Sequence, residues 1–181
     1  MAIATRLTIE EFKAIPGFDE RRLELIDGEL VEKPMPTWEH GRYALKIGAT
    51  LDQVGYASVE PRAMIPASPA FEASSPLPDV AFYRDTAPAR GEWMTRPPHV
   101  AVEVVSAGQS RREMRSKVEL YRSFGVESVW VVYPESETVE IFESGGRRTL
   151  GAADIITSPA APGFSLAVAD LFAVGGAAAQ G

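Results

Sequence analysis

The stretch PPHVAVEVVSAGQSRREMRSKVELYRSFG, residues 97–125, decides the fold of this chain. Residues 100–105 form a short apolar run with four valines, which is typical of a central strand covered on both faces. Glu103 alone interrupts this run. Because an isolated buried carboxylate is costly, Glu103 needs a partner.

An amphipathic helix follows this strand and carries a second charge on its apolar side. Met114, Val118 and Tyr121 recur at helical spacing and form one stripe, which defines the inward face. Lys117 lies on the same side of the helical wheel, although its four-carbon stem is long enough to carry the ammonium group to water. We interpret Glu103 and Lys117 as candidate members of one site.

The composition is that of one ordinary soluble domain. At 181 residues, 45% hydrophobic and 24% charged, the chain is long enough to bury roughly 70% of its unfolded surface. We predict a single domain over residues 1–173 and a flexible C-terminal tail over residues 174–181. Cysteine is absent, which excludes disulfides and thiolate metal sites, and the only histidines, His40 and His99, argue against a histidine-rich zinc centre.

The charge of the chain is acidic overall but uneven. The formal net charge of −7 argues against a protein that holds nucleic acid by bulk charge alone. Residues 111–122, however, carry five basic residues against two acidic ones, a local charge of +3. A polyanion could therefore bind locally along this helix.

No targeting or membrane segment is evident in the sequence. The N-terminus, MAIATRLTIEEF, lacks the basic start and apolar core of a signal peptide, and no apolar run approaches the roughly 18 residues of a membrane span. We therefore expect a cytoplasmic protein without a membrane partner.

Local patterns place the remaining elements. LELIDGELVE, residues 23–32, predicts a hairpin turned by Asp27-Gly28, in which Glu24 shares a face with Ile26 and is partly buried. Thr8 and Glu11 form a capping box for a short helix. We further expect a core-facing helix over residues 39–54 and a final helical turn starting at 170–172. Strands are expected over 78–83, 129–133, 139–142 and 155–156, and residues 56–65 form one or two strands broken by Pro61.

The candidate chemistry lies in acidic residues on strands. Asp79 begins one predicted strand and Glu103 lies toward the end of another. Two carboxylates about 4 Å apart repel by roughly 4 kcal/mol at an effective dielectric near 20, so they need a proton or a cation between them. Oxygen ligands favour hard divalent ions, which makes Mg²⁺ or Mn²⁺ the natural choice.

These residues resemble a known signature. Pro78-Asp79 followed by Glu103-Val104-Val105 is similar to the motif of the PD-(D/E)XK nuclease superfamily, with Val105 in the lysine position. The lysine is supplied instead by the helix, as Lys117. This variant resembles the Uma-two putative restriction endonuclease family. Other parts of the chain also resemble this family, namely LELIDGELVE, His40, KVELYRSFGVESVWVVYP and PGFSLAVADLF. The resemblance therefore covers nearly everything from residue 7 to residue 172.

The resemblance implies a metal-dependent DNA endonuclease that is commonly a homodimer. Its fold would be a restriction-endonuclease-like α/β core, with a central mixed β-sheet flanked by helices and an N-terminal β-hairpin. By position, Asp79, Glu103 and the main-chain carbonyl of Val104 would bind the metal, with Glu24 completing the site, and Lys117 would supply positive charge. Candidate substrate contacts are His40, Arg111, Arg112 and Arg115.

Three positions depart from the family pattern. Ala107 stands where proline is usual after serine, and Glu113 stands where aspartate is usual. Both are mild changes beside the expected site. Tyr133 precedes Pro134 where the family favours aspartate, which puts a peripheral contact in doubt.

The candidate site residues also have purely structural explanations. Pro-Asp at a strand start is common turn chemistry, a hairpin glutamate is usually solvated, and helix arginines usually form a solvated face. Two other functions therefore remain open. One is a nucleic-acid or protein binding module that keeps the nuclease fold without turnover, and the other is a metal-dependent hydrolase of another phosphoester.

Overall fold

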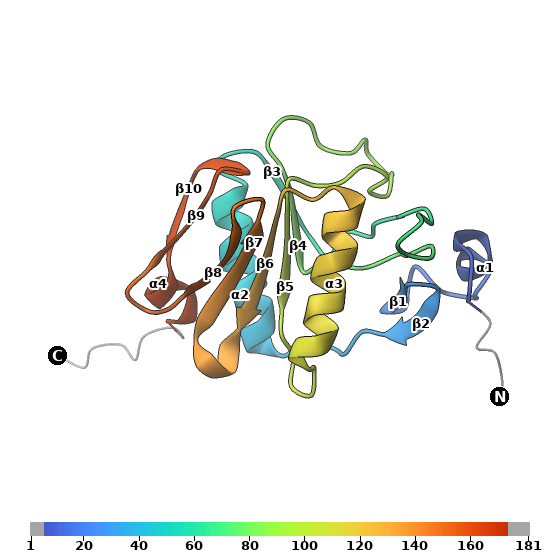
Figure 1. Ribbon diagram of the computed structural model, residues 1–181, viewed down its shortest axis with the longest axis horizontal. Helices are drawn as coiled ribbons and strands as arrows, with labels where there is room; N and C mark the ends of the chain where they lie inside the picture. Colours follow the sequence, from blue (N-terminus) through green and yellow to red (C-terminus); the bar gives the residue numbers. More distant parts are fainter. Residues whose placement is uncertain (1–5, 174–181) are drawn as a thin grey trace.

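The computed structural model describes residues 6–173, which form a mixed sheet flanked by helices (Figure 1). The expected tail, residues 174–181, lies outside the described residues. The six-stranded sheet has the order β3-β4-β5-β6-β7-β8. Its strands are β3 (Tyr56–Val59), β4 (Val80–Tyr83), β5 (Val100–Val104), β6 (Ser128–Tyr133), β7 (Thr138–Glu143) and β8 (Gly146–Leu150).

The strand and helix of residues 97–125 form the centre of this architecture. Every residue of β5 is buried, and β5 pairs in parallel with β6 through the crossover helix α3 (Arg111–Phe124). Ser110 caps α3 in a capping box with Glu113, because its hydroxyl accepts from the Glu113 N–H while the Glu113 side chain accepts from the Ser110 N–H. Gly125 ends the helix in the left-handed region, with φ 106°.

Alternation along β5 sends its side chains to two different layers. Val100, Val102 and Val104 pack in the larger core. This core lies on the side of α2 (Trp38–Leu51), together with β9 (Ile155–Ser158), β10 (Ala161–Ala167) and α4 (Val168–Phe172). Ala101 packs on the other face with the apolar stripe of α3. Glu103 shares the α3 face, which is why its carboxylate meets the helix.

The N-terminal hairpin forms a small layer beside α3 (Figure 1). Strands β1 (Leu23–Ile26) and β2 (Glu29–Glu32) turn at Asp27 and Gly28, which both have positive φ. Leu23 and Leu25 pack on Phe12 of α1 (Ile9–Lys13), in a separate apolar cluster. Glu24 therefore points away from that cluster.

Most predicted elements are confirmed. Of the strand region predicted over residues 56–65, the structure forms β3 at Tyr56–Val59, before Pro61, and isolated bridges at Ala63 and Ile65. The other corrections lie in the C-terminal third. Strands β8 and β10 were not predicted. The GRRTL sequence of β8 is mostly polar and exposed, and β10 contains Pro162 and Gly163 beside an irregular register. The last helix, α4, begins at Val168 rather than at residue 170. Among residues 6–173, we find no helix with the length and apolarity to span a membrane.

Candidate functional site

Glu103 is held by two residues of α3. It is 2% exposed, and its two oxygens accept from different donors. The Tyr121 hydroxyl donates to Oε1 at 2.6 Å, and the Lys117 ammonium donates to Oε2 at 3.2 Å. Burial raises the pKa of Glu103 more than the positive charge of Lys117 lowers it.

Lys117 connects Glu103 to the hairpin. Its Nζ lies 3.0 Å from both oxygens of Glu24, and its side chain is 8% exposed. Burial alone would lower the pKa of Lys117, but the carboxylates of Glu103 and Glu24 raise it above its ordinary value. Lys117 is therefore a charged ammonium at neutral pH, facing inward as the helical pattern predicted.

Glu24 is the hairpin's contribution to this network. It accepts the main-chain N–H of Leu77 at 2.8 Å in addition to the ammonium of Lys117. Leu77 lies two residues before Asp79. The hydrogen bond thus joins β1 to the segment that carries the other candidate carboxylate.

Asp79 lies directly before β4, beside the end of β5. Its Oδ2 accepts the main-chain N–H of Val104 at 2.6 Å, and its Oδ1 accepts the Lys33 ammonium at 2.6 Å. His40 Nε2 is 3.0 Å from the same Oδ1. Burial raises the pKa of Asp79, but the contacts with His40 and Lys33 outweigh burial and hold the pKa below its ordinary value.

The register of the sheet brings Asp79 and Glu103 together. Because Val80 pairs with Val102 in antiparallel strands, the residues one step further along fall at neighbouring positions. The negative charge of Asp79 contributes to the raised pKa of Glu103, as expected for nearby like charges. The site thus contains three buried carboxylates and two buried ammonium groups, those of Lys33 and Lys117.

His40 separates this buried site from a surface cavity. The His40 ring is buried, and its Nδ1 contacts Ser106 Oγ at 3.2 Å. Its Nε2 has no aligned hydrogen-bond partner, despite its 3.0 Å approach to Asp79. The cavity has a volume of about 620 Å³ and is lined by residues that include Met35, His40, Ser106, Gln109, Arg111 and Tyr133.

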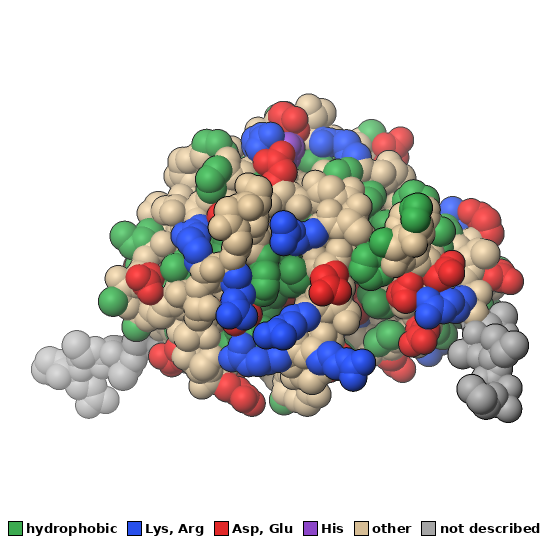
Figure 2. Space-filling view, in the orientation of Figure 1, with side chains coloured by type: hydrophobic (Ala, Val, Ile, Leu, Met, Phe, Trp, Pro, Cys, Tyr) green, Lys and Arg blue, Asp and Glu red, His purple; other side chains and the backbone are tan. Residues whose placement is uncertain are grey.

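Of the predicted basic residues, Arg111 lines this cavity, and the other two lie near it in sequence on the same helix. Arg111, Arg112 and Arg115 are exposed on the first turns of α3. Figure 2 shows Lys and Arg side chains gathered there and over the neighbouring β7–β8 hairpin. Arg111 stacks 4.3 Å from the centre of the Tyr133 ring and bonds Glu140 at 3.1 Å.

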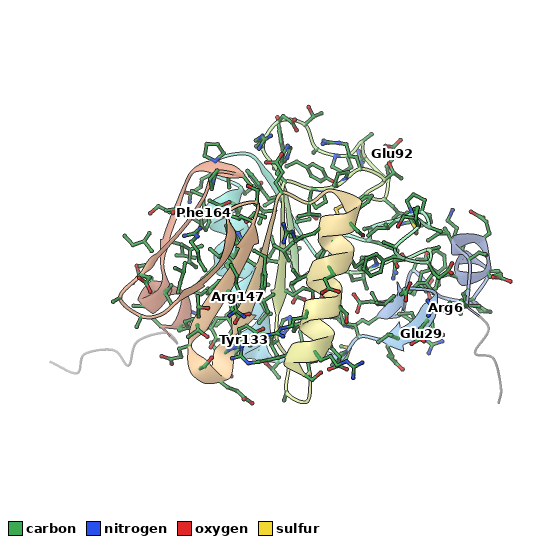
Figure 3. All side chains as sticks on the ribbon, viewed as in Figure 1. Arg6, Glu29, Glu92, Tyr133, Arg147 and Phe164 are labelled. Atoms are coloured by element: carbon green, nitrogen blue, oxygen red, sulfur yellow. The ribbon has the colours of Figure 1, made fainter. Side chains whose placement is uncertain are left out.

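Arg147 of β8 extends this basic surface, since it also approaches Glu140, at 3.7 Å. Tyr133 donates its hydroxyl to the same carboxylate at 3.2 Å. Both side chains lie close to the start of α3 in Figure 3. Tyr133, the residue that departs from the family pattern, therefore packs its ring against the guanidinium of Arg111 at the edge of the cavity.

The structure brings together the four residues predicted as catalytic, and it adds Lys33 and Tyr121. Tyr121 was predicted only as a member of the apolar stripe of the helix, because its spacing in the sequence does not show that its hydroxyl has a partner. Lys33 was not predicted as part of the site, because its partner Asp79 lies 46 positions away in the sequence. In the structure its N–H donates to the Arg22 carbonyl, and alternation places its side chain on the face of Glu24. His99 lies outside the site, where its Nδ1 accepts the main-chain N–H of Arg84.

The donor set fits a hard divalent ion. Asp79 and Glu103 offer buried carboxylate oxygens, and His40 Nε2 lies 3.0 Å from Asp79 Oδ1 without an aligned hydrogen bond. Within residues 6–173, no three His, Asp or Glu side chains are grouped as a complete ligand set. Mg²⁺ is commonly held by one or two carboxylates with waters and substrate phosphates, so Asp79 and Glu103 are the candidate ligands.

Comparison with known proteins identifies the family. A crystal structure described as a putative nuclease belonging to DUF820 from Anabaena variabilis ATCC 29413 is similar in fold, with a TM-score of 0.78 and 21% sequence identity over 92% of this chain and 97% of that chain. Comparison with curated proteins gives no match. Residues 9–169 match the family Uma2, described as "Putative restriction endonuclease". The chain therefore belongs to the Uma2 family of putative restriction endonucleases.

Proposed function

We propose that this protein is a metal-dependent DNA endonuclease that hydrolyses phosphodiester bonds with Mg²⁺ or Mn²⁺. The observation that carries the proposal is the buried group of Asp79, Glu103 and Lys117 in a chain of this family. Buried charges are costly, and a fold that needed only stability could fill the same volume with apolar side chains. Three carboxylates and two ammonium groups in one buried place therefore support a chemical role.

In the proposed site, Asp79 and Glu103 hold the ion from neighbouring strands. Glu24 and the main-chain carbonyl of Val104 complete the ligand set. When bound, Mg²⁺ or Mn²⁺ would polarise a phosphoryl oxygen and lower the pKa of a bound water. Tyr121 orients Glu103 through its 2.6 Å hydrogen bond.

Lys117 acts in this proposal as a fixed positive charge. Its raised pKa keeps it protonated at neutral pH, so it does not serve as a general base. Its ammonium can instead hold the attacking water or stabilise the negative charge that develops on the phosphate. Glu24 positions this ammonium through contacts of 3.0 Å.

The cavity and its basic rim are the proposed place for DNA. Arg111, Arg112 and Arg115 would contact backbone phosphates, and His40 lies between the cavity and Asp79. Because the chain carries a net charge of −7, we propose that two protomers pair to complete a basic groove. Light scattering that shows a strict monomer in the presence of DNA would contradict this pairing.

Plasmid cleavage tests the proposed activity. Supercoiled DNA is incubated with Mg²⁺ or Mn²⁺ and with the wild type, Asp79→Ala or Lys117→Met, after circular dichroism has shown that each variant is folded. Lys46→Met is the matched control, because among residues 6–173 the Lys46 ammonium contacts main-chain carbonyls near α4 and no carboxylate. We expect nicking by the wild type and control alone; equal cutting by all four proteins would refute the assignment.

One observation favours a second candidate, a binding module without turnover. Neither Asp79 nor Glu103 lines the cavity, and each carboxylate already has a lysine partner. A protein of this kind would bind DNA through its basic rim without an ion. Fluorescence anisotropy showing DNA binding in EDTA, with no cleavage in Mg²⁺ or Mn²⁺, would support it over the endonuclease.

A further inference from the structure

Lys33 is a second buried lysine at the site, and the nuclease motif does not explain it. It directly follows β2, and its N–H donates to the Arg22 carbonyl at 2.7 Å, which fixes its register opposite Arg22. Alternation then turns its side chain toward the face that carries Glu24. The hairpin therefore delivers one anion and one cation to the site.

The ammonium of Lys33 lies where a metal ion would use Asp79. Its Nζ is 2.6 Å from Asp79 Oδ1 and 2.5 Å from the Leu77 carbonyl oxygen, and the side chain is 4% exposed. The second oxygen of Asp79 accepts the Val104 N–H. Oδ1 has no main-chain donor and is therefore the natural oxygen for an added cation, but the Lys33 ammonium already contacts it, and His40 Nε2 lies 3.0 Å away.

The two lysines are not equivalent in this respect. Lys117 contacts both Glu24 and Glu103, so it can move away from Glu103 and still keep the carboxylate of Glu24 as a partner. Lys33 has Asp79 as its one carboxylate partner among the described residues. A divalent ion on Oδ1 would therefore place two positive charges in close, poorly screened contact unless Lys33 moved away.

We propose that Lys33 is a built-in competitor for the divalent ion, which binds Asp79 only when the ammonium of Lys33 withdraws from Oδ1. This inference rests on the proposed metal site. With Lys33 in place, the three carboxylates are largely neutralised before any ion arrives. Removal of Lys33 takes the ammonium away from Asp79 Oδ1 and from the Leu77 carbonyl oxygen, two ligands that suit a hard cation, and leaves the His40 ring as the neighbour of Oδ1.

Binding of Mn²⁺ alone, without DNA, tests the competition. Electron paramagnetic resonance of free Mn²⁺ gives the dissociation constant for the wild type, Lys33→Met and the matched control Lys46→Met. We expect Lys33→Met to bind Mn²⁺ at least tenfold more tightly than the wild type, and the control to bind like the wild type. The double variant Lys33→Met with Asp79→Asn should lose the gain.

Thermal unfolding with and without Mn²⁺ gives a second readout. Lys33→Met leaves Asp79 buried without an ammonium partner, so the melting temperature of this variant in EDTA should be below that of the wild type. Mn²⁺ should raise the melting temperature of the variant by more than it raises that of the wild type. If Lys33→Met does not fold, Lys33→Gln removes the same charge with a polar side chain and is measured in its place.

The outcomes separate this inference from the function on which it rests. If the wild type binds Mn²⁺ through Asp79 and the Lys33 variant binds it equally or more weakly, the competition is refuted and the metal site stands. The other outcome is that neither the wild type nor the Lys33 variant binds Mn²⁺, or that each binds it equally well after Asp79→Asn is introduced. In that case the proposed metal site is refuted, and the competition is refuted with it.

Discussion

Asp79 and Glu103 should respond differently to the loss of their charge, although cleavage is expected to need both. In Asp79→Asn the amide keeps one acceptor where the carboxylate serves both Lys33 and the Val104 N–H. The lowered pKa of Asp79 indicates that the fold favours its charge. Removing one partner from a buried ion pair costs about 3–5 kcal/mol, and we expect a loss of this size.

Glu103→Gln should cost much less. Burial raises the pKa of Glu103, so the fold disfavours its charge, and glutamine removes that penalty. Lys117 keeps Glu24 as its partner. Glu103 offers one oxygen to Lys117 and the other to Tyr121, whereas glutamine has a single acceptor oxygen, so the main loss is the acceptor of one of these two donors. Because relief of the penalty offsets much of the roughly 1–3 kcal/mol of an unmet hydrogen bond, we expect a net loss of about 1 kcal/mol or less.

Urea unfolding at pH 7 in EDTA measures this difference in the free energy of unfolding, with equal m-values as the check on comparability. Glu103→Gln should be the more stable variant by at least about 2 kcal/mol, and both variants should fail to cleave plasmid in Mg²⁺. Equal losses of stability, or a greater loss for Glu103→Gln, would refute the charge assignments of the site.

Three further predictions concern the same elements. Tyr121→Phe removes the 2.6 Å hydrogen bond to Glu103 and should lower the free energy of unfolding by about 1–3 kcal/mol in urea titrations. Gly125→Ala should cost about 1–2 kcal/mol in the same assay, because φ is 106° at this position. The raised pKa of Lys117 predicts that its pairing stabilises the fold fully below about pH 10.4 and is lost as the pH rises through the folded pKa. The lowered pKa of Asp79 predicts that its contribution to stability is present above about pH 3.9 and is lost as the pH falls through the folded pKa. The free energy of unfolding measured from pH 5 to 9 should therefore show no change due to the titration of either group.

Matched controls exist for two of these changes. Tyr56 is 52% exposed, so Tyr56→Phe should leave stability within about 0.5 kcal/mol of the wild type. Gly145 has open space around it and no positive φ, so Gly145→Ala should be nearly neutral. If either control loses as much stability as its partner variant, the structural reason given for that variant is wrong.

Much of the site could be predicted because its residues obey local periodicity. Glu103 alternates with the apolar residues of one buried strand, and Lys117 lies on the apolar stripe of the next helix. The Asp27-Gly28 turn fixes the hairpin and therefore the face of Glu24. Each of these placements depends on a few neighbouring residues, and the structure confirms that the side chains meet.

The remaining features depend on contacts between distant segments. Lys33 meets Asp79 across 46 positions of sequence, and nothing near Lys33 indicates that its partner is there. The apolar spacing of the helix predicts that the Tyr121 ring is buried, but it does not predict the partner of the hydroxyl. Strand β8 is stabilised by pairing with β7 rather than by its own exposed, polar side chains, so its composition resembles a loop.

The central claim is that Asp79 and Glu103 hold a divalent ion beside Lys117. Crystals soaked in Mn²⁺ and measured at a wavelength where manganese scatters anomalously test it most directly. We predict one strong anomalous peak in contact with a carboxylate oxygen of each residue, and its absence in Asp79→Asn crystals treated identically. No peak at these carboxylates, or a peak that persists in Asp79→Asn, would contradict the account.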